Sequence, residues 1–353
     1  MNELMLREIH AQPADLAAAL IDYRRQVASL GLQRPSKVVL AGSGDSGFAA
    51  SAVELAYTRA LECPVWALPS AGAARFGAGR IDGLTVLISV SGEVRRTIEA
   101  AMAAHNVGGK VVAITAGATS SLAGLADLVL VMPAPITRST PHTRDYTMTL
   151  LALLALLEGL SGIPLPELDA WPDQIRELLG PATEWADQLA DRFSGSDAAV
   201  WFLGMGPDRG TAAYAALKFW EAGGSAALWD DLEEFGHGSQ LMARPGQLAV
   251  LFACGPGASR AHEMVDGMRR MGLTPALISD ERMADRTLEL PRVRPELGPL
   301  LTSIPPQLLA YAFASRRGIE VELPMGGDPL GEVFDDVHRD WMRKSALNPT
   351  PSA

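Results

Sequence analysis

Cysteine is scarce in this sequence, with only Cys63 and Cys254 among 353 residues. Neither cysteine has the spacing of a zinc site or of a disulfide framework. We therefore interpret both as reduced thiols, and a disulfide-stapled secreted scaffold is excluded.

The sequence also lacks an apolar run long enough to cross a membrane. Its most apolar stretch, residues 148–157, is far shorter than the roughly 20 residues that a spanning helix needs. The first residues include Glu3, Arg7 and Glu8, whereas a signal peptide has a long apolar run there. We expect a cytoplasmic protein with no membrane partner.

The sequence is also poor in positively charged residues. It has 30 Lys and Arg residues and 41 Asp and Glu residues, which gives a net charge of -11. This balance argues against nucleic acid as a partner. An anionic ligand would need a local positive site, which the start of a helix supplies. The length and the hydrophobic fraction of 48% suit two globular domains, each with its own core.

Strand-like and helix-like segments alternate in both halves of the chain. This alternation predicts an α/β fold with two domains, each a parallel sheet flanked by helices in a doubly wound, flavodoxin-like three-layer sandwich. We place a helical arm at residues 1–30, the first domain at 31–170, the second at 195–338 and a tail at 339–353. The expected strands are residues 37–41, 65–68, 85–90, 111–115, 128–132, 199–204, 248–253 and 275–278.

A candidate phosphate-binding turn follows the apolar run at residues 84–88. Ser89 and Ser91 offer hydroxyl donors, and Gly92 removes the side chain that would keep a ligand away. A helix is expected directly afterwards, so that its unpaired N–H groups and dipole favour an anion. An ordinary helix cap is the alternative interpretation of such a turn.

Several motifs around this turn resemble the SIS (sugar isomerase) family. The turn itself, residues 89–97, is similar to the family's Ser-x-Ser-Gly-x-Thr-x-Asp/Glu-Thr loop, and residues 121–130 resemble its S-x-L-A…A-D-x-x-L ending. The resemblance implies a phosphosugar site whose binding residues include Thr97 and the turn after the strand at 37–41. In that turn lie Ser43, Gly44 and Ser46, and Asp45 between them is interpreted either as a sugar ligand or as a helix cap.

The resemblance extends over nearly the whole chain to the isomerase half of the glucosamine-6-phosphate synthases and to related amino-sugar phosphate deaminases and deglycases. It implies that Glu221 moves a proton between C1 and C2 of an open-chain sugar and that Lys218 stabilises the enolate oxygen. A surface ion pair is the alternative for these two residues. The motifs lie at residues 5–13, 201–206, 217–221, 234–238 and 306–311.

Two histidines are further candidates. His237 follows Glu221 by sixteen positions, and the resemblance implies that it opens the sugar ring from the neighbouring subunit of a homodimer with shared sites. Glu234 would orient this histidine or a sugar hydroxyl. His142 stands where relatives carry a serine that lines the sugar, so it either contacts the substrate or caps the next helix.

The sequence departs from the family at three points. Val94 replaces a threonine of the phosphate loop, and Arg96 replaces an acid. Residues 323–329 contain no lysine to form an imine with a ketose. Since the sequence starts at the isomerase lead-in, we also expect it to work without a glutaminase domain.

We therefore predict a phosphosugar-binding enzyme: an amino-sugar phosphate isomerase or deaminase, or a deglycase, that works through enediol or enolamine proton transfer. No metal or dissociable organic cofactor is implied, because the acid–base set needs neither. The second part of the chain, with residues 253–258 in place of the double-serine turn, is expected to hold no second phosphate. The alternative is a non-catalytic phosphosugar-sensing regulatory protein.

Overall fold

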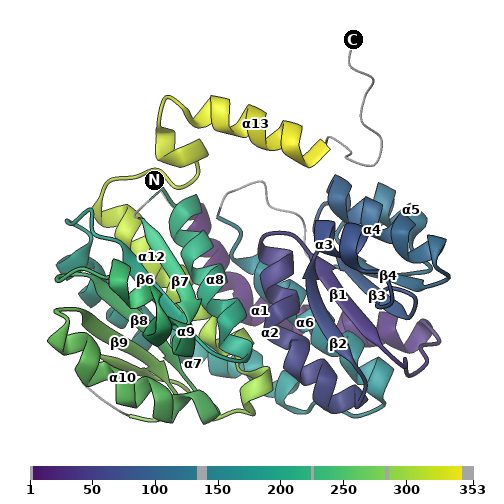
Figure 1. The fold of residues 1–353 in the computed structure, drawn as a ribbon, viewed down its shortest axis with the longest axis horizontal. Coiled ribbons are helices and arrows are strands. Elements are labelled where there is room, and N and C mark those ends of the chain that lie inside the picture. Colours follow the sequence, from purple (N-terminus) through teal and green to yellow (C-terminus); the bar gives the residue numbers. More distant parts are fainter. Residues whose placement is uncertain (1–2, 133–140, 224–225, 283–285, 344–353) are drawn as a thin grey trace. The chain divides into compact units, whose positions relative to one another are not determined.

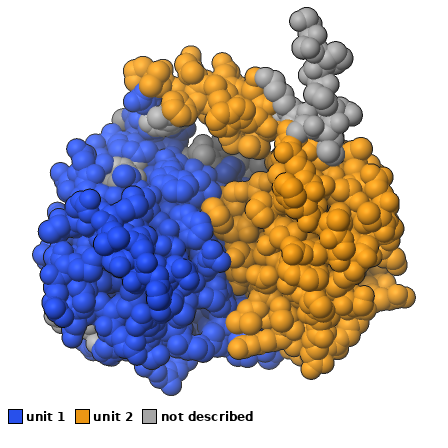
Figure 2. Space-filling model, viewed as in Figure 1, with its two compact units in different colours: residues 1–14, 138–147, 166–328 blue, residues 15–137, 148–165, 329–353 orange. Residues whose placement is uncertain are grey.

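The computed structural model describes residues 3–132, 141–223, 226–282 and 286–343, which are shown as ribbons in Figure 1. The chain divides into two compact units (Figure 2). Unit 1 comprises Met1–Ala14, Arg138–Thr147 and Pro166–Asp328, and unit 2 comprises Asp15–Thr137, Met148–Leu165 and Pro329–Ala353. Each unit contains one five-stranded parallel sheet with helices around it, so the predicted α/β class is confirmed.

The sheet of unit 2 has the strand order β2-β1-β3-β4-β5, and all of its pairs are parallel. This is the flavodoxin-like order, in which the ligand binds where β1 and β3 lie side by side. The apolar strands are buried because helices cover both faces of the sheet. The strands are β1 (Val38–Gly42), β2 (Val65–Pro69), β3 (Leu84–Ile88), β4 (Lys110–Thr115) and β5 (Leu128–Val131).

One face of this sheet packs against helices α3, α4 and α5 through a core that includes Val39, Leu87 and Val111. On α2, the Tyr57 hydroxyl donates to the carbonyl of Leu153 on α6 at 2.7 Å. The helices are α1 (Glu3–Ser29), α2 (Asp45–Leu61), α3 (Ser70–Phe76), α4 (Arg95–Asn106), α5 (Ser121–Leu125), α6 (Arg144–Ser161) and α13 (Gly331–Arg343); along the chain, α1 and α6 each pass from one unit into the other.

The sheet of unit 1 repeats this order. Its strands run β10-β9-β8-β6-β7, which read from the β7 edge corresponds to the order in unit 2. The internal repeat of fold type is therefore present, although the sequences of the two copies differ. The strands are β6 (Val200–Gly204), β7 (Ala227–Asp231), β8 (Leu248–Ala253), β9 (Thr274–Ser279) and β10 (Thr287–Glu289).

The core of unit 1 lies on both faces of this sheet. Helices α9 and α10 cover one face, where Trp201 meets Phe235 edge to face at 5.2 Å. On the other face, Phe219 of α8 contacts Phe202 of β6 and Phe313 of α12. The helices are α7 (Glu167–Phe193), α8 (Pro207–Glu221), α9 (Leu232–His237), α10 (Ala258–Arg270), α11 (Pro299–Thr302) and α12 (Ile304–Arg316), with 3-10 turns η1 (Ser239–Met242), η2 (Gly255–Gly257), η3 (Pro295–Leu297) and η4 (Pro324–Gly327).

Two local features of the structure differ from the sequence-based expectations. Strands β7 and β10 are not among the expected strands, because β7 ends in two aspartates and β10 has only three residues. Helix α1 lies within the arm expected at residues 1–30 and keeps Pro13 inside it, since buried Met5, Ile9 and Leu16 pack that helix on both sides of the proline. Residues 339–343, assigned to the tail, belong to helix α13, and the rest of the tail lies outside the described residues.

Candidate active site

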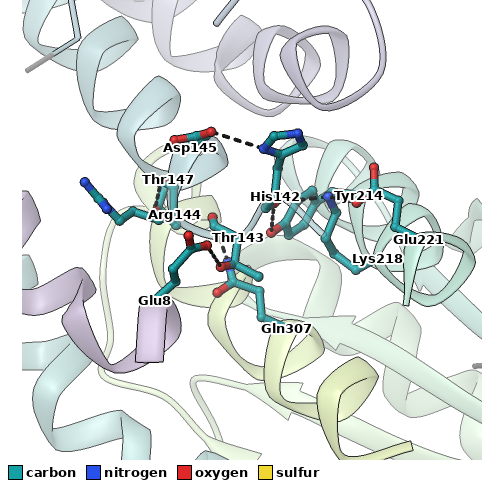
Figure 3. Close-up of polar contacts among 10 residues, drawn as sticks. All are labelled: Glu8, His142, Thr143, Arg144, Asp145, Thr147, Tyr214, Lys218, Glu221 and Gln307. Atoms are coloured by element: carbon teal, nitrogen blue, oxygen red, sulfur yellow. Dashed lines mark hydrogen bonds and ion pairs between the residues drawn. The ribbon is translucent and has the colours of Figure 1, made fainter. Parts of the chain in front are cut away.

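The last turn of α8 brings a lysine and a glutamate together in unit 1 (Figure 3). Lys218 and Glu221 are three residues apart, which places them on one face of the helix. The Lys218 ammonium is 0% exposed and donates to a Glu221 carboxylate oxygen. The Glu221 side chain is 19% exposed, so it is the member of the pair that a ligand can reach.

The same ammonium holds a second segment of unit 1, residues 142–147, in place. Lys218 Nζ donates to the backbone carbonyl of His142 at 3.0 Å, and the Tyr214 hydroxyl donates to that carbonyl at 3.3 Å. The Tyr214 ring stacks on Tyr146 with 3.6 Å between ring centroids and 11° between planes. These contacts attach the start of α6 to α8.

The other side of this segment is held by a network of uncharged polar groups and one carboxylate. Gln307 of α12 donates to the carbonyl of Thr143 at 3.4 Å and accepts from Gln12 at 2.7 Å. Thr147 donates to Gln12 at 2.8 Å, and the Thr143 hydroxyl lies 3.5 Å from a carboxylate oxygen of Glu8. All five side chains are buried, which makes this segment a rigid part of unit 1.

His142 is a partly exposed member of this segment. Its side chain is 36% exposed, and its Nδ1 lies 3.1 Å from a carboxylate oxygen of Asp145, which is 4% exposed. The hydrogen bond to Asp145 raises the pKa of His142 above its ordinary value, partly opposed by burial and by the Lys218 charge. In Figure 3 the imidazole and the Glu221 carboxylate both point away from Gln307.

His237 ends helix α9 and lies in unit 1 as well. Its side chain is 67% exposed, and Nε2 lies 3.0 Å from a carboxylate oxygen of Glu233. Glu233 also binds Arg260, and the bonds from His237 and Arg260 lower the pKa of the Glu233 carboxyl. Glu234 is exposed. Because the ring-opening role of His237 is expected across subunits, it stays a prediction.

The predicted phosphate loop follows β3 in unit 2. Ser89 is buried, and its hydroxyl oxygen accepts from the Gly92 amide at 3.1 Å, while the exposed Ser91 accepts from the Glu93 amide at 3.2 Å. Each hydroxyl keeps its own hydrogen to donate. Gly92 has φ +69°, and a Cβ there would lie 2.0 Å from Ser120 Oγ, so only glycine fits.

The start of α4 leaves its first turn without a side-chain cap, since Val94 precedes it. Its unpaired amide groups are therefore available to an anion. Arg96 binds the buried carboxylate of Glu99 at 2.6 Å, one turn further along α4. The arginine that replaces the family's acid thus forms an ion pair within its own helix. Thr97 is buried, and its hydroxyl lies 2.9 Å from that of Ser70.

The other turn of the predicted phosphosugar site follows β1, the strand next to β3. Ser43 is exposed and Ser46 is buried at the start of α2. Gly44, which directly precedes α2, has φ +56°, a conformation that favours glycine. The turns after β1 and β3 therefore lie on neighbouring strands at the carboxyl edge of the sheet, where doubly wound folds bind ligands.

The corresponding edge of unit 1 carries acidic side chains, among them Asp208 and Asp280. Asp208, at the start of α8, is buried and accepts from Thr302 at 2.7 Å. Burial, and to a lesser extent the charge of Asp280, raises the pKa of Asp208 to about 6. Cys254 follows β8 at the same edge, and burial raises the pKa of its thiol. An anion would be repelled here.

Sequence reasoning missed Tyr214 and Asp145. Tyr214 precedes Lys218 by four residues, and Asp145 follows His142 by three. Tyr214 and Lys218 share one face of α8, whereas His142 lies two residues before α6 and Asp145 lies in the first turn of α6. Both short spacings are local signals that could have found these residues. Glu8 and Gln307 come from distant parts of the chain, and no local spacing connects them to His142 or Thr143.

Neither a membrane span nor a metal centre is found in the part of the chain that the structure describes. None of the helices there is both long and apolar enough to cross a membrane. Within those same ranges, no three His, Cys, Asp or Glu side chains are grouped so that they could hold a metal ion.

Comparison with known proteins identifies a domain and relatives of this chain. Residues 31–159 match the SIS domain. The glutamine–fructose-6-phosphate aminotransferase (isomerizing) of Pyrobaculum aerophilum is 29% identical over 340 residues, which cover 91% of this chain and 56% of that enzyme. The chain thus spans little more than half the length of this relative.

Two solved structures have the same fold. Glucosamine-6-phosphate deaminase from Thermotoga maritima has a TM-score of 0.77 at 20% identity, covering 90% of this chain and 96% of its own. Tagatose-6-phosphate ketose/aldose isomerase from Escherichia coli has a TM-score of 0.78 at 17% identity, covering 99% and 97%. The chain therefore contains an SIS domain at residues 31–159 and is homologous to the isomerase half of the glutamine–fructose-6-phosphate aminotransferases.

Proposed function

We propose that this protein is an enzyme that acts on a sugar phosphate by acid–base catalysis, either as an aldose–ketose isomerase or with release of an amine. The observation that carries the proposal is the Lys218–Glu221 pair, in which a buried ammonium holds a partly exposed carboxylate. A carboxylate held in this way can take a proton from one sugar carbon and return it to the next. The names of the relatives support a phosphosugar as the substrate.

In this proposal Lys218 orients Glu221, whereas from the sequence we expected it to stabilise the enolate oxygen. Its ammonium is fully buried and already binds the carbonyl of His142 and the carboxylate of Glu221. It is therefore a positioning residue, because the ammonium orients the carboxylate without reaching the solvent-facing side of the site.

The phosphate group is assigned to unit 2. Ser89, Ser91 and Gly92 form a tight turn before the uncapped start of α4, and Ser43, Gly44 and Ser46 form the turn after the neighbouring strand. Hydroxyl and amide donors at the start of a helix suit a phosphate dianion. The hydroxyl of Thr97 contacts that of Ser70, which joins the first turn of α4 to the start of α3.

The test is hydrogen exchange in D₂O, followed by NMR, with fructose 6-phosphate and glucosamine 6-phosphate, together with an assay for ammonia release. We expect deuterium at the carbon next to the carbonyl, and Glu221→Gln should reduce its incorporation by about 10²–10⁴-fold. Glu263→Gln, a change on the exposed face of α10, is the matched control.

Two results would contradict the proposal. Wild-type exchange that survives in Glu221→Gln would remove Glu221 from the chemistry. Binding of the sugar phosphates without exchange or ammonia release would favour the alternative, a phosphosugar-sensing protein.

A further inference from the structure

A histidine and an aspartate form a pair beside the Glu221 carboxylate. His142 Nδ1 faces the nearly buried Asp145 carboxylate at 3.1 Å, which fixes the orientation of the ring. A neutral imidazole has one N–H, and a carboxylate at Nδ1 selects the tautomer in which Nε2 is free to accept a proton. Nε2 is thus the atom that can exchange protons with a ligand.

The position of the ring is fixed through its backbone as well as its side chain. The carbonyl of His142 accepts from both Lys218 and Tyr214, and the Tyr214 ring stacks on Tyr146. Lys218 therefore contacts both candidate proton carriers, His142 through its carbonyl and Glu221 through its carboxylate. One buried ammonium sets the geometry of both groups.

The charges that face the imidazole come from two helices. Asp145 on α6 and Glu221 on α8 favour the protonated ring, while Lys218 on α8 and burial oppose it. A carboxylate oxygen of Glu8 on α1 lies 3.5 Å from the hydroxyl of the adjacent Thr143. The hydrogen bond to Asp145 is the largest of these effects and keeps the pKa of His142 above its ordinary value.

We propose that His142, oriented by Asp145, is the second proton-transfer group of the site and serves the sugar oxygens while Glu221 serves the carbons; this rests on the proposed function. Glu221 takes the proton from the carbon beside the carbonyl, and that C–H electron pair becomes the C=C bond of the enediol. The imidazolium gives its Nε2 proton to the carbonyl oxygen, whose π electrons form the new O–H bond. In the second half, the imidazole takes the proton of the other hydroxyl as Glu221 returns its proton to the neighbouring carbon.

The first test is an NMR titration of the histidine rings. The His142→Gln spectrum assigns the His142 resonance, and Asp145→Asn should lower the pKa of that ring. Asp127→Asn, which removes the carboxylate that lies 3.1 Å from His105, is the matched control and should leave His142 unchanged. An unchanged His142 titration in Asp145→Asn would overturn the pairing.

The second test is the pH profile of solvent exchange with fructose 6-phosphate. His142→Gln should lower kcat by about 10²–10⁴-fold with little change in KM. Asp145→Asn should shift the limb of the profile that reports the imidazole to lower pH, an effect that a purely structural residue would not produce. His142→Asn serves as a second variant if the glutamine variant fails to fold.

The outcomes separate the two proposals. Loss of exchange in Glu221→Gln with a wild-type rate and profile in His142→Gln would overturn the role of His142 and leave the proposed function standing. Wild-type exchange in Glu221→Gln would contradict the proposed function itself. Loss of exchange in both Glu221→Gln and His142→Gln, together with the shifted limb of the pH profile in Asp145→Asn, would support both proposals.

Discussion

Replacing Asp208 with asparagine should stabilise unit 1 at high pH and leave it unchanged at low pH. The Asp208 carboxyl is buried among Thr211 and Thr302, and its pKa rises from 3.8 to about 6 on folding. Below pH 3.8 the group is protonated in both states, so it contributes no pH dependence. As pH rises from 3.8 to 6 the unfolded chain ionises first, and the folded state becomes relatively less stable. Above pH 6 the penalty is complete, at about 3 kcal/mol for a pKa that rises by about two.

Urea denaturation of the wild type and Asp208→Asn at pH 4, 5, 6 and 8 measures this penalty. The asparagine amide oxygen can still accept from Thr302, so the two proteins should be about equally stable at pH 4. At pH 8 the variant should be more stable by about 3 kcal/mol. Asp266→Asn, on the exposed face of α10, should show no such dependence. A stability difference that stays constant from pH 4 to pH 8 would show that Asp208 keeps an ordinary pKa in the folded state.

Three further changes test the site. Gly92→Ala should lower the free energy of unfolding by about 2 kcal/mol more than Gly108→Ala does. Both glycines have positive φ, but only at Gly92 would an added Cβ clash with Ser120. Thermal or urea unfolding measures the difference. Lys218→Met should lower the free energy of unfolding by about 2–3 kcal/mol. Lys37→Met, at a partly exposed pair with Asp82, should lower it much less. Adding Glu221→Gln to Lys218→Met should restore part of the loss. Ser91→Ala should raise the Kd for a sugar phosphate about tenfold in calorimetry and leave that of the free sugar unchanged, with Ser196→Ala as control. An equal effect on both sugars would remove Ser91 from the phosphate site.

The fold could be predicted because strands that are buried on both faces of a sheet have a recognisable sequence pattern. Buried parallel strands such as residues 84–88 are continuous apolar runs, and their order in the chain predicts the doubly wound sheet. The two strands that were not predicted, β7 and β10, lack such an apolar run. Strand β7 keeps half-exposed Asp230 and Asp231, and β10 is held by three residues beside β9. Neither has the apolar run that identifies the others.

The site was predictable only where its residues are neighbours in sequence. Lys218 and Glu221 share one helix face through their spacing, and the turn at Ser89 is marked by its place after a strand. What the ammonium of Lys218 does could not be predicted, since one of its partners is a backbone carbonyl 76 residues away. Backbone acceptors have no residue type of their own, so sequence patterns cannot reveal them.

The two ends of helix α8 carry carboxyl groups with different roles in unit 1. Asp208 lies in its first turn, at the carboxyl edge of the sheet, and Glu221 is its last residue. At about 1.5 Å per residue, these two residues are about 20 Å apart along the helix axis. A sugar phosphate held at that edge would not reach Glu221, and the buried Asp208 and the nearby charge of Asp280 oppose an anion there. Asp280→Asn is accordingly expected to leave solvent exchange into fructose 6-phosphate at the wild-type rate. A large loss of exchange in that variant, with the fold intact, would place the substrate at this edge and remove the last turn of α8 from the chemistry.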